Sequence, residues 1–170
     1  AGAAEAAIDR VGSGWHDRGT RIGGVAARRV GSAPRTVAAL ITLDTSGSYA
    51  LLDARDPDHE LTAAALRADP GPYLVPAGIL AEIAYLIEAR LGDRVLDLWL
   101  ADLASGAFMI DCGDGDLARI RELVTRYADL PLGFADASVI ACAERSGGRV
   151  LTLDRDFTVV SREVPLTILP

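Results

Sequence analysis

The chain has 170 residues, half of them hydrophobic, and its 24 acidic and 17 basic residues give a net charge of -7, which fits one soluble acidic domain. Every basic residue is an Arg, because the sequence contains no Lys. P-loop NTPases, Schiff-base enzymes and kinases all need a Lys, so these classes are excluded. The acidity also argues against broad electrostatic binding of nucleic acid, although not against a nuclease whose acids hold a metal ion.

Residues 1–38 differ from the rest of the chain. They hold six Arg against three acids, with repeated Gly and no sustained helical or strand period. We expect a flexible N-terminal extension here and one folded domain over residues 39–170. That domain has 11 Arg and 21 acids, a net charge of -10.

The sequence pattern of residues 39–170 predicts strands that alternate with helices. The apolar run 39–43 predicts a buried strand that ends at Asp44, and further strands are expected at 73–75, 107–110, 149–153 and 166–169. Helices are expected at 46–53, 58–69, 77–91, 93–105, 116–128 and 134–146. Continuous apolar strands between helices indicate an α/β fold: a three-layer α/β/α domain with a central parallel sheet of four to five strands.

The two cysteines and two histidines do not form a metal motif. Cys112 and Cys142 have no CxxC spacing, and only His16 and His59 could join them, so a zinc site is not expected. Two reduced cysteines suit a cytoplasmic protein. No apolar run approaches the roughly 20 residues of a membrane span, so no membrane contact is expected.

Four acids stand where a solvated surface residue is not expected. Asp44 and Asp154 each follow an apolar strand, and the carboxyl ends of parallel strands are where sites form in open α/β sheets. Glu82 and Asp136 lie within helical segments of small and apolar residues, where a carboxylate needs a partner. The structural alternatives remain open: Asp44 and Asp136 could cap helices, and Asp154 could form an Asp turn.

Taken together, these four acids indicate a metal site. Carboxylates that converge repel one another, and Mg²⁺ or Mn²⁺ binding relieves that repulsion, whereas zinc prefers His or Cys. Such an ion can activate water and offset charge on a phosphodiester. Ser46 could donate a hydrogen bond to a ligand, or simply cap the following helix.

The chain resembles the PIN-domain ribonucleases, particularly the VapC toxins of bacterial toxin–antitoxin pairs. The resemblance covers about residues 39–170 and rests on four segments. They are Leu43-Asp-Thr-Ser46, Leu80-Ala-Glu-Ile-Ala84, Asp129-Leu-Pro-Leu-Gly-Phe-Ala-Asp-Ala-Ser138 and Thr152-Leu-Asp-Arg-Asp-Phe157.

The resemblance implies an Mg²⁺- or Mn²⁺-dependent endoribonuclease with Asp44, Glu82, Asp136 and Asp154 as its acidic quartet. Asp156 falls where such proteins sometimes have an auxiliary ligand, although it could equally be a surface turn acid. The resemblance also implies a homodimer that a cognate antitoxin inhibits. Among the Arg residues, Arg155 is the first candidate for an RNA phosphate contact, against an ion pair with a neighbouring acid, and a single-stranded or looped RNA is the expected substrate.

One other function of the folded domain and the role of residues 1–38 stay open. A catalytically silent PIN-like module that pairs with an antitoxin-type partner would keep the same fold, and RNA cleavage assays distinguish it from a nuclease. The resemblance does not extend to residues 1–38, which could be an upstream-start artefact, an RNA-contacting arm or an antitoxin-like tail. A phospho-receiver domain, in contrast, would need a Lys that this chain does not have.

Overall fold

The computed structural model describes residues 40–69 and 71–170, so the predicted extension lies outside the described residues. Within this part, five parallel strands form one sheet in the order β3-β2-β1-β4-β5. The strands are β1 (Ile41–Leu43), β2 (Tyr73–Pro76), β3 (Met109–Asp111), β4 (Arg149–Leu151) and β5 (Thr167–Leu169). Strand β1 is central and pairs in parallel with β4, so the acids that follow these two strands lie at the same edge of the sheet.

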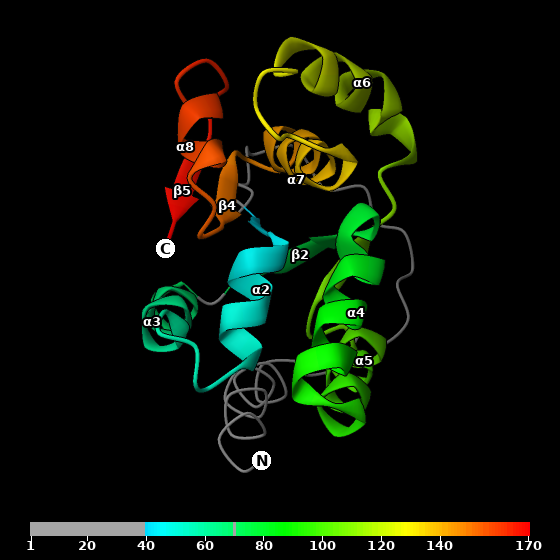
Figure 1. Ribbon diagram of the computed structural model, residues 1–170, viewed down its shortest axis with the longest axis vertical. Coiled ribbons are helices and arrows are strands. Elements are labelled where there is room, and N and C mark those ends of the chain that lie inside the picture. The colour runs from blue at the N-terminus through cyan, green and yellow to red at the C-terminus, as the bar shows by residue number, and fades with distance from the viewer. Residues whose placement is uncertain (1–39, 70) are drawn as a thin grey trace, which may run out of the picture.

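Helices connect the strands in the order that the sequence predicts. They are α2 (Thr45–Leu52), α3 (His59–Ala68), α4 (Leu80–Leu91), α5 (Asp93–Ser105), α6 (Leu117–Arg126), α7 (Phe134–Arg145) and α8 (Asp156–Val160), with short 3₁₀ turns η1 (Ala77–Ile79) and η2 (Asp114–Asp116). Figure 1 shows the central strands between α2 on one side and α7, covered by α6, on the other. The predicted three-layer α/β/α arrangement is confirmed. None of the helices within the described ranges combines the length and the hydrophobicity needed to cross a membrane.

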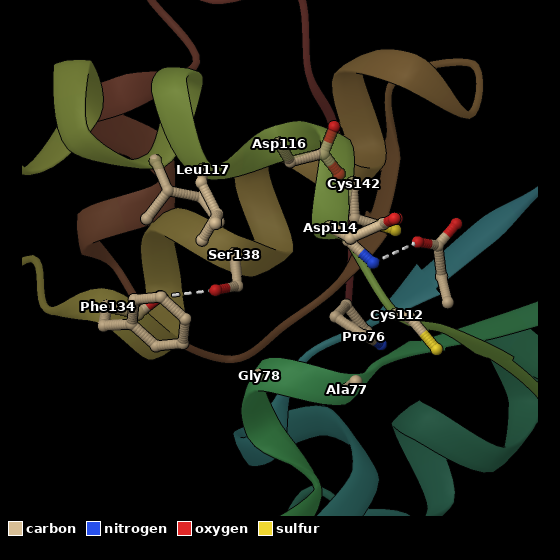
Figure 2. Close-up of a pocket in the computed structure, with 13 residues that line it drawn as sticks. Pro76, Ala77, Gly78, Cys112, Asp114, Asp116, Leu117, Phe134, Ser138 and Cys142 are labelled. Carbon is tan, nitrogen blue, oxygen red and sulfur yellow. Dashed lines mark hydrogen bonds between the residues drawn. The ribbon is translucent and has the colours of Figure 1, made fainter.

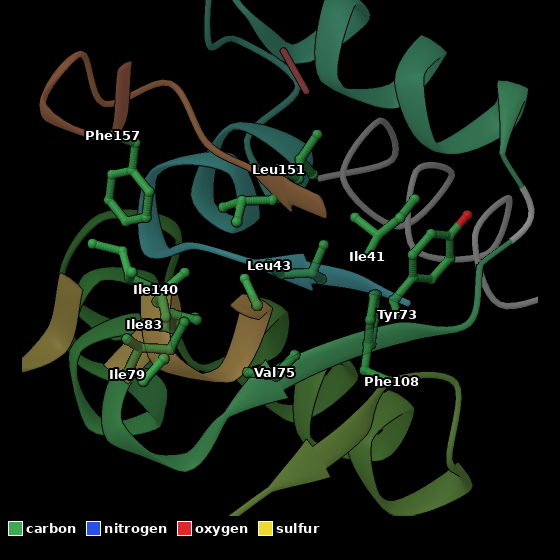
Figure 3. Close-up of a cluster of buried hydrophobic side chains, with 14 of the residues drawn as sticks. Ile41, Leu43, Tyr73, Val75, Ile79, Ile83, Phe108, Ile140, Leu151 and Phe157 are labelled. Carbon is green, nitrogen blue, oxygen red and sulfur yellow. The ribbon is translucent and has the colours of Figure 1, made fainter. Parts of the chain in front are cut away.

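The hydrophobic core lies between the sheet and its helices. Strand residues Ile41 and Leu151 are fully buried, and so are Ile79, Ile83 and Ile87, which are spaced four residues apart on one face of η1 and α4 (Figure 3). This stripe fixes the rotation of α4 about its axis. The opposite face of α4 is therefore exposed to solvent.

The differences from prediction are small and local. The strand expected at 149–153 ends at Leu151, although the Thr152 backbone N–H still donates to the Leu169 carbonyl of β5 at 3.1 Å. Helix α8 was not predicted, since its five residues are too short to show a helical period. The helix expected from residue 77 begins with the 3₁₀ turn η1, directly after Pro76.

Candidate active site

Asp44 lies at the carboxyl end of β1 and caps helix α2. Its carboxylate accepts the backbone N–H of Ser46 at 3.3 Å, and its backbone is extended, as in a helix N-cap. The hydroxyls of Ser46 and Thr152 donate to the same oxygen, Oδ2, at 2.6 and 2.8 Å. Only 4% of Asp44 is exposed, so these donors compensate for its burial. None of the three bonds uses the second oxygen, Oδ1.

Thr152 connects the ends of β1 and β4 and is a residue that the sequence analysis missed. Its hydroxyl donates to Asp44 and accepts the backbone N–H of Asp154 at 3.0 Å. The Ser46 hydroxyl makes a second link, because it accepts the backbone N–H of Leu153 at 3.0 Å. The only signal in the sequence was a Thr in the segment expected to form a strand, two positions before Asp154. Asp44 and Asp154 are thus held together by a shared network.

The helix geometry explains why α2 can approach β4 closely. Gly47 is buried in the first turn of α2, and a Cβ atom at this position would lie 2.7 Å from the carbonyl oxygen of Leu151. A residue with a side chain would therefore push α2 away from β4. The absence of a side chain at Gly47 allows Ser46 to reach the backbone of the β4 end.

Glu82 lies in the first turn of α4, and it is exposed. Its Oε2 accepts the Thr45 hydroxyl at 3.1 Å, which places it beside the start of α2. The interpretation of Glu82 as a carboxylate buried among apolar helical residues was wrong, because Ile79 and Ile83 face the core while Glu82 is exposed. Glu82 nonetheless reaches the same sheet edge as Asp44.

Asp136 lies in the first turn of α7 and is partly buried. Its carboxylate accepts the backbone N–H of Gly133 at 3.0 Å, but α7 already begins at Phe134, so Asp136 supports the cap from inside the first turn and is not the N-cap of a helix that starts later. Burial raises the pKa of Asp136, and the nearby charges of Asp44, Asp154 and Glu82 raise it further against the opposing effect of the Gly133 hydrogen bond. The four acids singled out in the sequence therefore lie within electrostatic range of one another.

Asp154 follows β4 and forms the Asp turn that the sequence analysis left open. Its Oδ1 accepts the backbone N–H of Asp156 at 2.9 Å, and Asp156 then begins α8. Arg155 lies between them and is exposed. Across residues 40–69 and 71–170, no ion pair joins Arg155 to an acid, so the alternative of a local salt bridge does not apply.

Four other Arg residues that the sequence offers for phosphate contact already have partners within the protein. Arg55 pairs with Asp53, and Arg149 pairs with Asp69. Arg90 lies over the Tyr49 ring, 5.6 Å from its centroid, where a cation–π contact stabilises it. Arg145 is held by Asp111 and Asp116 at 2.8 and 2.9 Å. Arg155 is the candidate whose charge is left for a substrate.

The four acids do not form a preassembled metal cage. In the part of the chain that the structure describes, no three His, Cys, Asp or Glu side chains are grouped closely enough to hold an ion. Each of the four acids accepts a hydrogen bond from a neighbouring group, so one oxygen of each carboxylate is already engaged. The donor set nevertheless fits a hard cation, because it consists of carboxylate oxygens whose mutual repulsion an ion would relieve.

Comparison with known proteins identifies the fold family. Residues 41–163 match the PIN domain family. Ribonuclease VapC26 of Mycobacterium tuberculosis is 34% identical over 115 residues, which cover 66% of this chain and 85% of that protein. Ribonuclease VapC of Mycolicibacterium smegmatis is 33% identical over 118 residues, with 65% and 88% covered.

A solved structure agrees with these relatives. The crystal structure of VapC20 of Mycobacterium tuberculosis, described as a toxin that cleaves the sarcin–ricin loop, superimposes with a TM-score of 0.63 at 27% identity. The match covers 71% of this chain and 94% of VapC20. The acidic edge of the sheet and these relatives lead to one assignment: the chain belongs to the PIN-domain family and is a VapC-type endoribonuclease.

Proposed function

We propose that this endoribonuclease is the toxin of a toxin–antitoxin pair and cuts single-stranded or looped RNA with Mg²⁺ or Mn²⁺ held by Asp44, Glu82, Asp136 and Asp154. One observation carries the proposal: Thr152 joins Asp44 to Asp154 at neighbouring strand ends, Glu82 reaches Thr45 at the start of α2, and the raised pKa of Asp136, caused by burial and by the charges of these three acids, agrees with this arrangement. Bringing these carboxylates together is unfavourable without a counter-charge, and a divalent cation supplies it.

The chemistry of the side chains favours a hard cation over zinc. The four proposed ligands offer only oxygen. His59, the one histidine among the described residues, is buried and shares a 2.9 Å hydrogen bond with the carbonyl oxygen of Ala50. This hydrogen bond joins α3 to α2, so the His59 side chain serves the contact between these two helices. Oxygen ligands without nitrogen or sulfur are what Mg²⁺ and Mn²⁺ prefer.

The chain's own residues then have separate roles. A bound divalent cation supplies an activated water and offsets the charge on the phosphodiester. Ser46 and Thr152 fix Asp44 through Oδ2 and leave Oδ1 for the ion. Ser46 is thus a positioning residue, and Asp156 is an auxiliary ligand candidate next to Asp154. Hydrolysis by water predicts products with 5′-phosphate and 3′-hydroxyl ends, whereas a 2′,3′-cyclic phosphate would contradict this scheme.

Charge complementarity supports the proposed substrate and the proposed protein partner. Arg155 lies beside Asp154 and is free to contact a phosphate on the strand that is cut. The neighbour that cleaves the sarcin–ricin loop favours a looped RNA as the target here as well. A cognate antitoxin with a basic segment would neutralise the same acids that the metal neutralises. We further propose that the protein is a cytoplasmic homodimer, as the resemblance implies.

The proposal is tested by cleavage of total RNA with the purified full chain in the presence of Mg²⁺ or Mn²⁺. Asp44→Asn and Asp136→Asn are compared with Asp97→Asn, which removes the same charge from an exposed position on α5. We expect both site variants to lose cleavage while Asp97→Asn keeps it.

Two outcomes would contradict the proposal. Equal cleavage by Asp44→Asn and the unmodified chain would show that the acids are not the site. Cleavage that is unaffected by EDTA and does not need an added divalent cation would remove the metal from the mechanism. Absence of cleavage of any RNA by the unmodified chain would instead favour a silent PIN-like module.

A further inference from the structure

A pocket of about 230 Å³ opens between α7, η1 and the segment that follows β3. Its two ends differ in chemistry, as Figure 2 shows: Phe134 and Leu117 lie at one end, Asp114 and Asp116 lie toward the other, and Ser138 stands between them. Pro76, Ala77 and Gly78 form the opposite wall. We call this cavity the η2 pocket. Its volume suits one small planar group rather than a whole nucleotide.

The apolar end of the η2 pocket has an unusually exposed aromatic ring. Phe134 is 55% exposed and Leu117 is 59% exposed, although both line a cavity that could cover apolar surface. Gly78 keeps the wall facing this end close, because a Cβ atom there would lie 2.6 Å from the Ser138 hydroxyl and 3.2 Å from the Phe134 ring. An exposed ring at a narrow cavity is a stacking platform for a flat ligand.

The polar end offers hydrogen-bond acceptors. Arg145 already occupies Asp111 and Asp116, and the Ser138 hydroxyl donates its proton to the Phe134 carbonyl at 2.7 Å. Within residues 40–69 and 71–170, Asp114 has neither a hydrogen bond nor an ion pair, and it is exposed at the pocket. The charged group left available here is the Asp114 carboxylate, which accepts hydrogen bonds and therefore calls for a ligand with N–H donors.

The η2 pocket shares its framework with the acidic site. Helix α7 carries Asp136 in its first turn, with Phe134 two residues before it and Ser138 two residues after it. Positions 134 and 138 lie on one face of the helix, and position 136 lies on another. The pocket also contains Pro76 and Asp111, the last residues of β2 and β3, whereas Asp44 and Asp154 follow β1 and β4, so both sites lie along one edge of the sheet and an RNA strand that follows this edge meets both.

We propose that the η2 pocket binds an unpaired guanine of the RNA substrate next to the phosphate that is cut, with its ring on Phe134 and its Watson–Crick edge on Asp114. The inference rests on the proposed function of the acidic site. Guanine has two neighbouring donors, N1–H and N2–H, that match the two oxygens of one carboxylate. Adenine and cytosine offer one amino group at this edge, and uracil offers one N3–H between two carbonyl oxygens that the carboxylate would repel.

The first test maps cleavage ends on an RNA pool that is randomised at every position. The unmodified chain should show guanine enriched at one position beside the cut, and Asp114→Asn should lower that preference about tenfold, since one bidentate contact discriminates bases by roughly this factor. Asp97→Asn is the matched control and should keep the preference. Phe134→Leu should weaken cleavage of guanine-containing RNA about tenfold by loss of stacking, and Phe134→Tyr should restore it.

The second test separates this inference from the proposed function. Cleavage-deficient Asp44→Asn protein is titrated with fluorescent RNA hexamers that differ only in one central base, G, A, C or U, alone and combined with Asp114→Asn. Tighter binding of the G hexamer that is lost in the double variant is the expected result. Efficient cleavage without any base preference would overturn the guanine pocket while leaving the nuclease intact.

An arginine-containing peptide provides the competing outcome. Its guanidinium also presents donors to a carboxylate, so it is added to the same titrations. Peptide binding that depends on Asp114 and Phe134, together with RNA binding that does not, would assign the pocket to a protein partner and refute the proposal.

Discussion

Replacing Thr152 by Val removes the hydroxyl that joins the two strand ends and keeps the size and shape of the side chain. Thr152 is 3% exposed, so no water replaces the lost group easily. Asp44 loses the donor at 2.8 Å, and the Asp154 backbone N–H loses its acceptor at 3.0 Å. A hydrogen bond to a charged group contributes about 1.5–3 kcal/mol, so we expect the free energy of unfolding to fall by about 2–3 kcal/mol.

The same change should reduce cleavage. Groups that orient a metal ligand typically alter metal affinity or activity by about 10–100-fold when they are removed, and Thr152→Val should lie in that range. Urea unfolding without metal gives the stability, and cleavage rates across a Mg²⁺ titration give the activity. Thr152→Ser keeps the hydroxyl and should retain most of both.

Thr62→Val is the matched control for this experiment. Thr62 is also buried, and its hydroxyl donates to the Asp58 carbonyl at 2.8 Å, far from the acids in sequence and on α3. The Thr62 backbone N–H bonds the same carbonyl, so the loss leaves no group unpaired there. It should cost less stability and leave cleavage unchanged. If Thr152→Val matched Thr62→Val in both measurements, the network would have no special role.

Three further predictions follow from single residues. The pKa of Asp136 is raised in the folded protein, so its negative charge opposes folding, and the metal-free protein should lose stability as pH rises through that pKa. Asp136→Asn removes this charge, so it should unfold at higher temperature near neutral pH although it no longer cleaves RNA. Metal-dependent cleavage should instead decrease as pH drops, because Asp136 becomes protonated. If neither the stability nor the cleavage rate changed with pH, the raised pKa of Asp136 would be refuted. Gly47→Ala should lower the free energy of unfolding by about 1–3 kcal/mol, measured with urea, because its Cβ would meet the Leu151 carbonyl. Arg155→Ala should weaken RNA binding and reduce the slope of log affinity against log salt by about one, without a change in melting temperature; an unchanged slope would remove Arg155 from the interface.

The sequence was sufficient for the strands, the longer helices and the layer order, because apolar runs and helical periods are local signals, but it did not show the short helix α8. It also identified Asp44, Glu82, Asp136 and Asp154 as acids at one sheet edge. In two cases the structural alternative is present in a residue that is also a proposed metal ligand: Asp44 caps α2 and Asp154 forms an Asp turn, whereas Asp136 accepts the Gly133 N–H from inside the first turn of α7.

Other features could not be predicted from local patterns. Thr152 bonds Asp44 across 108 positions of the chain, and no spacing rule indicates such a contact. The exposure of Glu82 depends on the rotation of α4, which the Ile79, Ile83 and Ile87 stripe sets and which apolar neighbours in sequence obscured. The η2 pocket combines residues from β2, η2 and α7, so it exists only after the chain has folded.

The central position of β1 has a consequence for synthesis of the protein on the ribosome. Asp44 is made early, but its partners Thr152 and Asp154 follow β4, and β4 pairs directly with β1. A nascent chain that stops before Arg149 lacks both the neighbouring strand and half of the strand-end acids. If Asp44 and Asp154 act together as proposed, the site cannot assemble before the segment that carries β4, Thr152 and Asp154 has been made.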